Sequence, residues 1–192
     1  MEKEDISRRL FLIRSLAGVS AGWLLAKLPD IQAAQEHVHK TSQTEGPLKF
    51  EFFTPEQAAD VEAIAARIIP SDETPGAREA RVVYFIDRAL TTFDREQQPL
   101  YIKGLKQLDA RRRLMWSGRT SFAALGPEQQ DKLLRRIEKG KFFEAVRTHT
   151  VMGFLCDPGR GGNHDLAGWK LLGFEDKFFY KPPFGYYDAE AR

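Results

Sequence analysis

The 192-residue sequence has little of several features that would assign a function directly. Its single cysteine excludes an internal disulfide framework, a cysteine-rich zinc site and an iron–sulfur cluster held by this chain alone. Its 29 basic and 27 acidic residues nearly cancel, whereas nucleic-acid-binding proteins usually have a clear basic excess. Its 42% hydrophobic content excludes a wholly disordered chain. The composition is therefore that of one ordinary globular domain with an added segment.

The N-terminal residues are typical of an export signal rather than of a folded element. An apolar stretch follows Arg14 and ends at Ala26, which is too short to cross about 30 Å of hydrocarbon comfortably. Upstream of it, residues 7–12 read Ser-Arg-Arg-Leu-Phe-Leu and are similar to the twin-arginine signal of proteins that are exported folded. We therefore predict a periplasmic protein, a partnership with the twin-arginine translocase, and an export signal formed by Ser7, Arg8, Arg9, Phe11 and Leu12.

Two other interpretations of residues 1–34 stay open. The segment could be retained as an amphipathic or anchor helix, or it could be an ordinary first helix of the domain. Its cleavage site is poorly defined, because Ala33 and Ala34 supply small residues but Ile31 and Gln32 precede them. An uncleaved signal would keep the protein at the membrane.

The rest of the chain predicts an all-α fold, a small bundle of about five helices. Residues 35–49 are polar and are expected to form a linker, so that the domain occupies residues 50–192. Thr54 can cap the first helix, with Pro55 in its first turn and Gln57 completing a capping box. Beyond it, apolar residues recur at helical spacing, with no convincing alternation typical of strands. The helices are expected between Thr54 and Pro70, about Ala77 and Phe93, about Pro99 and Trp116, Gly126 and Gly140, and about Lys141 and Leu155.

The last forty residues are expected to form a loop-rich, aromatic C-terminal segment. Residues 157–163 contain one proline and three glycines, which disfavour a helix. Seven aromatic residues follow between Phe174 and Tyr187. An extended aromatic tail has to be buried, either against the domain itself or against a partner chain.

Motifs that carry chemistry are scarce in this sequence. It has no G-x-G-x-x-G and no Cys-x-x-Cys-His, so neither a dinucleotide site nor an attached haem is indicated. His37 and His39 lie in the linker, and His149 lies on a predicted helix, where a packed histidine is the favoured interpretation. His164 beside Asp165 could form an acid–base pair, but no nucleophile accompanies it. We predict no catalytic residue, no cofactor-binding residue and no metal ligand in this chain.

Two charged runs are interpreted as structural. Asp72-Glu73 is expected to cap a helix, and Arg111-Arg112-Arg113 is expected to form a solvated face rather than a phosphate contact. From residue 35 onward the chain carries 24 basic and 23 acidic residues. Such a near-neutral surface offers no long-range attraction to nucleic acid or to anionic lipid.

The lone cysteine, Cys156, leaves two alternatives open. Free cysteines are among the most buried residue types, so a buried thiol that packs as a small apolar group is favoured. In an exported protein, an unpaired cysteine can also form a disulfide with another chain.

Two segments carry motifs that gain specificity in combination. The first is Phe53–Gln57 followed by Ala63–Ala77 and Val82–Asp87, and the second is Gly153–Pro158 followed by Gly161–Asp165 and Gly168–Phe174. Together they resemble the gluconate 2-dehydrogenase subunit 3 family, over about residues 50–175. This chain has Arg160 at a position where the family often has an aromatic residue.

The resemblance implies an accessory subunit. Members of this family accompany a flavoprotein dehydrogenase of the glucose–methanol–choline type, a large subunit that holds FAD and oxidises sugars, sugar acids or alcohols. Some complexes add a multihaem cytochrome c, whose haem c groups pass electrons to membrane quinone and whose presence would associate the complex with the membrane. The small subunit is thought to escort the folded flavoprotein through the twin-arginine pathway and to support its maturation. The alternatives are a stand-alone periplasmic enzyme that uses His164 and Asp165, and a binding protein unrelated to redox chemistry.

The partner interface is expected at the loop that follows the fifth predicted helix. This loop is rich in glycine and lies between an unpaired cysteine and aromatic residues, a combination that suits an obligate interface. The alternative is that Trp169 and its neighbours simply close the core of the bundle. The candidate interface residues are Cys156, Asp157, Pro158, Gly161, Gly162, Asn163 and Trp169.

Overall fold

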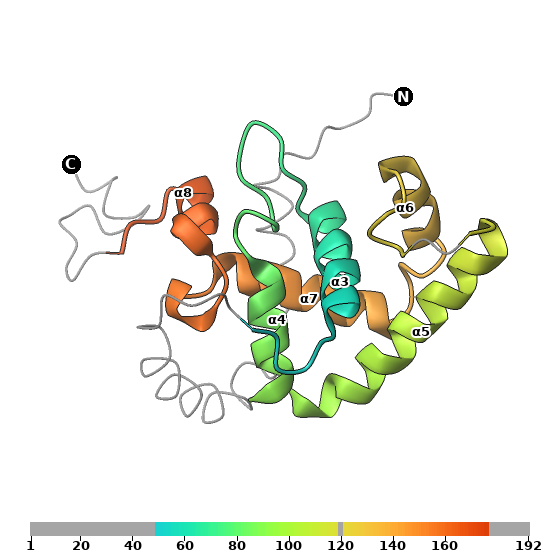
Figure 1. Ribbon diagram of the computed structural model, residues 1–192. Helices are drawn as coiled ribbons and strands as arrows, with labels where there is room; N and C mark the ends of the chain where they lie inside the picture. The colour runs from blue at the N-terminus through green and yellow to red at the C-terminus, as the bar shows by residue number, and fades with distance from the viewer. Residues whose placement is uncertain (1–48, 119–120, 177–192) are drawn as a thin grey trace, which may run out of the picture.

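The computed structural model describes residues 49–118 and 121–176. The predicted export signal, nearly all of the linker and the aromatic tail beyond residue 176 lie outside the described residues. The described part confirms the all-α prediction, since it contains no strand (Figure 1). Its α-helices are α3 (Pro55–Ile68), α4 (Val82–Thr91), α5 (Gln98–Met115), α6 (Pro127–Leu134), α7 (Lys141–Leu155) and α8 (Ala167–Leu172), and its short 3₁₀ helices are η1 (Arg95–Gln97), η2 (Pro158–Arg160) and η3 (His164–Leu166).

Helix α7 is the central element of the bundle. It contacts α3, α4, α5 and α8 and contributes several fully buried residues to the core. Figure 1 shows α5 and α6 around the N-terminal end of α7, whereas α8 lies at the other end of the molecule. Among the described residues, no helix is both long enough and apolar enough to span a bilayer.

Most helix boundaries follow local signals in the sequence, although α6 ends at Leu134 and not near Gly140 as predicted. The capping box at Thr54 is present, with the Gln57 amide N–H donating to Thr54 Oγ1 and the Thr54 amide N–H donating to Gln57 Oε1. Helix α4 begins at Val82 rather than near Ala77, because the preceding residues form a turn in which Arg81 is left-handed, with φ of 54°. The short α8 was not predicted, since it lies in the segment expected to be loop.

The segment before α3 is fastened to the bundle by a buried carboxylate. Asp87 on α4 accepts the backbone N–H groups of Glu51, Phe52 and Phe53 at 2.7, 3.1 and 2.9 Å. Three N–H donors compensate the loss of water around a buried carboxylate, so this contact fixes the direction from which the chain enters α3.

Candidate functional site

The C-terminal end of α7 is capped by the loop that follows it. The last carbonyls of a helix have no partner within the helix and need donors from elsewhere. Here the Trp169 indole N–H donates to Leu155 O at 2.8 Å, and the Asn163 amide Nδ2 donates to Cys156 O at 2.8 Å. Two residues of the predicted interface therefore cap the central helix.

Two glycines allow the loop to lie directly against the backbone of α7. A Cβ at Gly162 would fall 2.1 Å from Gly153 O, and a Cβ at Gly168 would fall 2.0 Å from Phe154 O. Both separations are far inside van der Waals contact with backbone atoms that cannot easily move. The spacing of these glycines is thus explained by close packing on a helix.

Asn163 holds the loop closed with both ends of its amide. Its side chain is buried, with 0% of its surface exposed, and its Oδ1 accepts the Gly168 N–H at 2.8 Å while its Nδ2 reaches Cys156 O. Its backbone is left-handed, with φ of 47°, which asparagine tolerates better than most residues. Asn163 is therefore a structural junction between α7 and α8.

The residues predicted to form the interface divide into two groups. Gly162 and Asn163 are buried within the chain. Asp157 is exposed and accepts the Gly159 N–H at 2.8 Å, which starts η2. The remaining candidates are half-buried, so each still presents some surface; they are Cys156, Pro158, Gly161 and Trp169. A contact of this exposed part with a partner stays a prediction.

Cys156 is half-buried, and its thiol donates to Gly153 O at 3.3 Å. Burial raises the pKa of the Cys156 thiol to about 12, an effect that the nearby Gly162 N–H and Arg160 only partly offset. A neutral thiol is a poor nucleophile. The geometry agrees with the interpretation of a packed, free cysteine, and a disulfide to another chain stays an untested alternative.

A polar network lies in the core, beside α5 and α7. The Tyr101 hydroxyl and His149 Nδ1 are 2.8 Å apart, and His149 Nε2 and Asp94 Oδ2 are 2.7 Å apart. All three side chains are buried, and burial raises the pKa of Tyr101 well above its ordinary value. The expectation that His149 is a packed and satisfied histidine is confirmed.

The network has the residue types of an acid–base relay but no access to a substrate. Tyr101 and His149 stack at 5.8 Å between ring centroids, and Phe142 covers Tyr101 edge-on. Asp94 Oδ1 has no hydrogen-bond partner among the described residues. Sequence reasoning missed Asp94 as a partner of His149, because 55 residues separate them along the chain.

The pair singled out for acid–base chemistry is open to solvent. His164 Nε2 and Asp165 Oδ2 are 3.5 Å apart, with side chains 40% and 81% exposed. Water screens an interaction between two side chains this exposed. Within residues 49–118 and 121–176, no three histidine, cysteine, aspartate or glutamate side chains are grouped as metal ligands would be.

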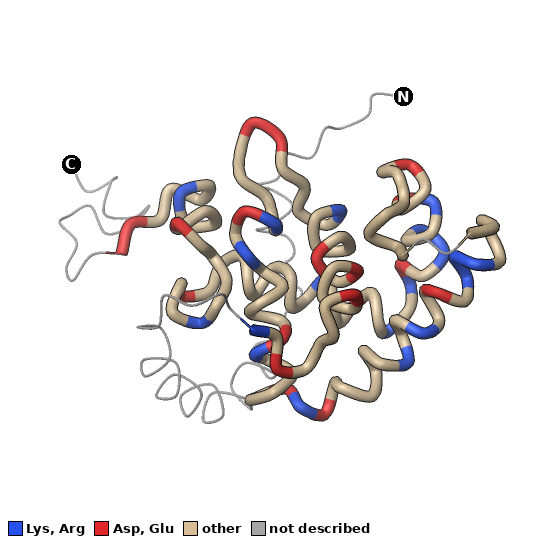
Figure 2. Tube along the Cα trace, viewed as in Figure 1, with Lys and Arg blue, Asp and Glu red and all other residues tan. Residues whose placement is uncertain are grey.

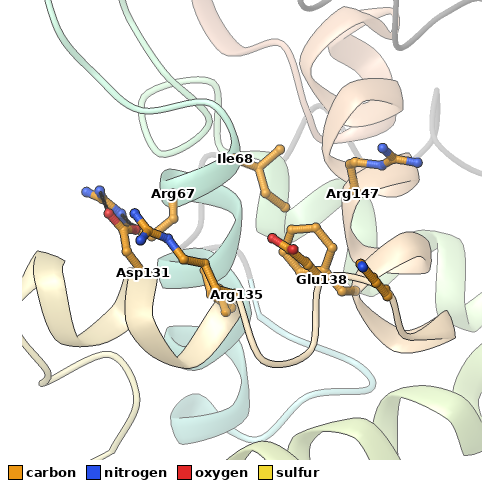
Figure 3. Close-up of a pocket in the computed structure, with 9 residues that line it drawn as sticks. Arg67, Ile68, Asp131, Arg135, Glu138 and Arg147 are labelled. Carbon is orange, nitrogen blue, oxygen red and sulfur yellow. Dashed lines mark hydrogen bonds and ion pairs between the residues drawn. The ribbon is translucent and has the colours of Figure 1, made fainter. Parts of the chain in front are cut away.

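A pocket of about 510 Å³ opens between α3, the end of α6 and α7 (Figure 3). Arg67 and Asp131 lie side by side at one edge, with two contacts of 2.7 Å between guanidinium and carboxylate, and Arg147 lies across from them. This pair raises the pKa of Arg67. The pocket is lined by charges of both signs, and the Arg67 guanidinium is already neutralised by Asp131. The lining residues are Arg67, Ile68, Asp131, Leu134, Arg135, Glu138, Lys139, Phe143 and Arg147.

A second cleft, of about 290 Å³, lies between α5 and the turn that leads into α7. It shares Lys139 with the first pocket, but no carboxylate lines it. Figure 2 shows Lys and Arg gathered on this α5 and α6 side of the molecule. The near-neutral total therefore hides a segregation of charge, since residues 98–147 hold 12 basic and 5 acidic residues.

The arginine run on α5 only partly fits its expected solvated face. Arg111 and Arg113 are exposed, but Arg112 is 3% exposed and pairs with Asp109 at 2.8 Å. The prediction for Arg112 is wrong, because the helix turns it inward, where the Gly118 carbonyl also accepts its guanidinium N–H. Consecutive helix positions point in different directions, so one of three arginines faced the bundle.

Comparison with known proteins gives one match. The sequence model of the family described as gluconate 2-dehydrogenase subunit 3 matches residues 55–176, which include every helix of the described part. No curated protein and no solved structure matches the chain.

Proposed function

Since this chain belongs to the gluconate 2-dehydrogenase subunit 3 family, we propose that it is the non-catalytic small subunit of an FAD-dependent dehydrogenase complex. The large subunit is a flavoprotein of the glucose–methanol–choline type that oxidises a sugar, a sugar acid or an alcohol. The match over residues 55–176 is the observation that carries this proposal, because it covers more than half of the chain.

The second part of the proposal is an escort role in export. The signal-like residues 7–12 belong to a pathway that carries folded proteins. A flavoprotein that takes up FAD in the cytoplasm has to cross the membrane already folded, and one signal on the small subunit can serve both chains. This role places the complex in the periplasm and makes the small subunit part of the flavoprotein's maturation.

The surface around α8 is the proposed contact with the flavoprotein. Leu166 and Phe174 are 39% and 49% exposed, and the Phe174 ring packs edge-on against Trp169 at 5.1 Å between centroids. Exposed apolar groups beside a half-buried tryptophan form the type of surface that supplies most of the binding energy at interfaces. The buried junction at Asn163 holds this surface rigid against α7.

Export is tested by replacing the two arginines of the signal. The variant Arg8→Lys with Arg9→Lys keeps the charge but removes the paired guanidinium groups. We expect both the small subunit and the flavoprotein to remain in the cytoplasm, as measured by fractionation and flavoprotein activity. The matched control is Arg14→Lys, which changes an arginine of the same segment outside the pair and should leave export intact.

Two results would overturn the escort proposal. One is normal periplasmic delivery of the flavoprotein with the double-lysine small subunit. The other is export of the flavoprotein in cells that lack the small subunit altogether. Separately, copurification of the small subunit with a flavin-containing large chain tests the complex itself, and a monomeric small subunit with dehydrogenase turnover of its own would contradict it.

A further inference from the structure

The cleft between α5 and the turn before α7 concentrates positive charge without a counter-ion. Its lining residues include three lysines and two arginines and no carboxylate; the five cations are Lys103, Arg111, Arg136, Lys139 and Lys141. None of the five forms an ion pair within the part of the chain that the structure describes, and all five are exposed. This cleft differs from the neighbouring pocket, where Arg67 and Asp131 neutralise each other.

The five cations are held together by the fold. Helix α5 and the start of α7 meet closely, since a Cβ on Gly104 would lie 2.2 Å from the Phe142 ring. The Arg111 guanidinium donates to Arg136 O at 2.9 Å, which ties the wall formed by α5 to the turn after α6. Like charges held close together repel one another, so an anionic partner would gain from binding here without first ordering the cleft.

The shape and the floor of the cleft indicate which kind of anion fits. Three apolar side chains line it together with the cations: Leu100, Ile137 and buried Phe142. A concave site of about 290 Å³ offers more contact to a chain segment that fills it than to a flat bilayer surface. An apolar floor with a cationic rim suits a segment that carries carboxylates among aliphatic side chains. Leu114, 87% exposed, adds apolar surface to the same helix.

We propose that this basic cleft binds an acidic segment of the dehydrogenase large subunit, at the end of α7 opposite the α8 surface. The inference rests on the proposed function and deepens it, because it assigns the small subunit a second contact of defined chemistry. The lysine ammonium groups pair with aspartate or glutamate carboxylates of the partner, and the arginines add donors that can bind a carboxylate with two N–H groups.

The proposal is tested on the purified complex with a water-soluble carbodiimide, which joins an amine to a carboxylate only where the two touch. We expect peptides that link Lys103, Lys139 or Lys141 to aspartate or glutamate of the large subunit. Two exposed lysines that do not line the cleft, Lys49 and Lys132, serve as internal controls and should give few such links.

A matched pair of variants measures the strength of the contact. The triple variant Arg136→Gln, Lys139→Gln, Lys141→Gln removes three charges from the cleft. The control Lys49→Gln, Arg78→Gln, Arg95→Gln removes three exposed charges elsewhere. We expect the cleft variant to weaken the complex about tenfold or more in about 0.05 M salt, with the difference shrinking in about 1 M salt. The control should change the affinity by less than about twofold.

The outcomes separate this inference from the proposed function. If the wild-type chain binds no flavoprotein, the proposed function fails and takes this inference with it. If the complex forms but the cleft lysines give no links and the cleft variant binds normally, only the inference is overturned. Protection of the same lysines from acetylation by phosphatidylglycerol vesicles, but not by the flavoprotein, would assign the cleft to a membrane and also overturn it. An equal loss in both triple variants would show a general charge effect and refute a specific site.

Discussion

The two ends of α7 differ in whether the chain itself supplies partners for their polar and charged groups. At the C-terminal end, the loop over residues 157–168 satisfies the last helix carbonyls from within the chain, through Asn163 and Trp169. At the N-terminal end, a group of cations surrounds a cleft and finds no carboxylate in the described chain. The C-terminal end therefore needs no partner chain to satisfy its carbonyls. At the N-terminal end, a bound anion would reduce the repulsion among the cations.

The comparison teaches that a motif can be diagnostic of a family because of packing rather than contact with a ligand. Gly162 and Gly168 lie where a side chain would strike the α7 backbone, and Asn163 lies where its amide caps the end of that helix. The basic cleft, in contrast, is not a local sequence motif, because its residues come from α5, from the turn before α7 and from the first residues of α7. Its identity as one surface depends on the tertiary fold.

The largest expected effect is that of Gly162→Ala. The new Cβ would meet Gly153 O at 2.1 Å, and neither backbone can retreat without breaking the cap of α7. We expect the free energy of unfolding to fall by more than about 4 kcal/mol, measured by urea denaturation followed by circular dichroism.

Gly126→Ala is the matched control for this change. Gly126 has an ordinary φ of −65°, and its nearest neighbour to an added Cβ is a side-chain atom at 3.8 Å. It should cost less than about 1 kcal/mol. Equal stability of the two variants would mean that the loop does not pack on α7 as described.

The next prediction concerns the reactivity of Cys156. With its pKa raised from 9.0 to about 12, the thiol holds about a thousandth of the thiolate of an ordinary cysteine at pH 8. Alkylation by iodoacetamide should therefore be about a thousandfold slower in the folded protein than in urea. The rate should keep rising with pH beyond 9, and the raised pKa also means that this group's contribution to stability is lost as the pH rises above 9.0.

An exposed cysteine provides the control for this rate. In Cys156→Ser, Leu114→Cys the only thiol lies at a position that is 87% exposed in the native protein. It should react at the rate of a free cysteine. If Cys156 in the folded wild type reacts as quickly as this control, the thiol is not buried and the alternative of a disulfide to a partner gains ground.

Removing a carboxylate from the buried network should lower the free energy of unfolding more than removing one from a surface ion pair. Asp94→Ala leaves His149 without the carboxylate at 2.7 Å, and we expect a loss of about 3 kcal/mol. Asp131→Ala breaks the half-exposed pair with Arg67 and should cost about 1 kcal/mol or less. A double-mutant cycle of Asp94→Ala with Tyr101→Phe then measures how strongly the two ends of the network are coupled through His149. Additive losses would contradict a connected network.

The sequence predicted the helices well wherever the signals are local. The capping box at Thr54 and the apolar periodicity of α3, α5 and α7 depend on residues within a few positions of each other. The start of α4 was misplaced because the left-handed Arg81 turn has no glycine or proline to mark it. Helix α8 was missed because its six residues are too short for periodicity to detect.

The sequence identified several residues of the candidate site but not what each of them does in the fold. The sequence drew attention to Asn163, Gly162 and Trp169 without showing that they close onto α7, which depends on the path of the loop. The pairing of Asp94 with His149 joins positions 55 residues apart, and no local pattern encodes it. A total charge near zero likewise conveyed nothing about how lysine and arginine are distributed over the folded surface.

The smallest expected effect concerns the repulsion among the cleft cations, measured on the isolated subunit. If the cleft cations repel one another, their repulsion lowers the stability of the folded chain and is screened by salt. Ion pairs elsewhere, such as that of Arg67 with Asp131, are weakened by the same salt, so the salt dependence of the wild-type stability alone is not diagnostic.

The difference in stability between variants isolates the contribution of the cleft. We expect Arg136→Gln, Lys139→Gln, Lys141→Gln to be more stable than the wild type by about 0.5 kcal/mol in about 0.02 M salt, and equal to it in about 0.5 M salt. The control Lys49→Gln, Arg78→Gln, Arg95→Gln, whose positions do not line the cleft, should show no such gain. A cleft variant that is less stable than the wild type at low salt would mean that the cations stabilise the subunit itself, and the N-terminal end of α7 would then be as complete as the other.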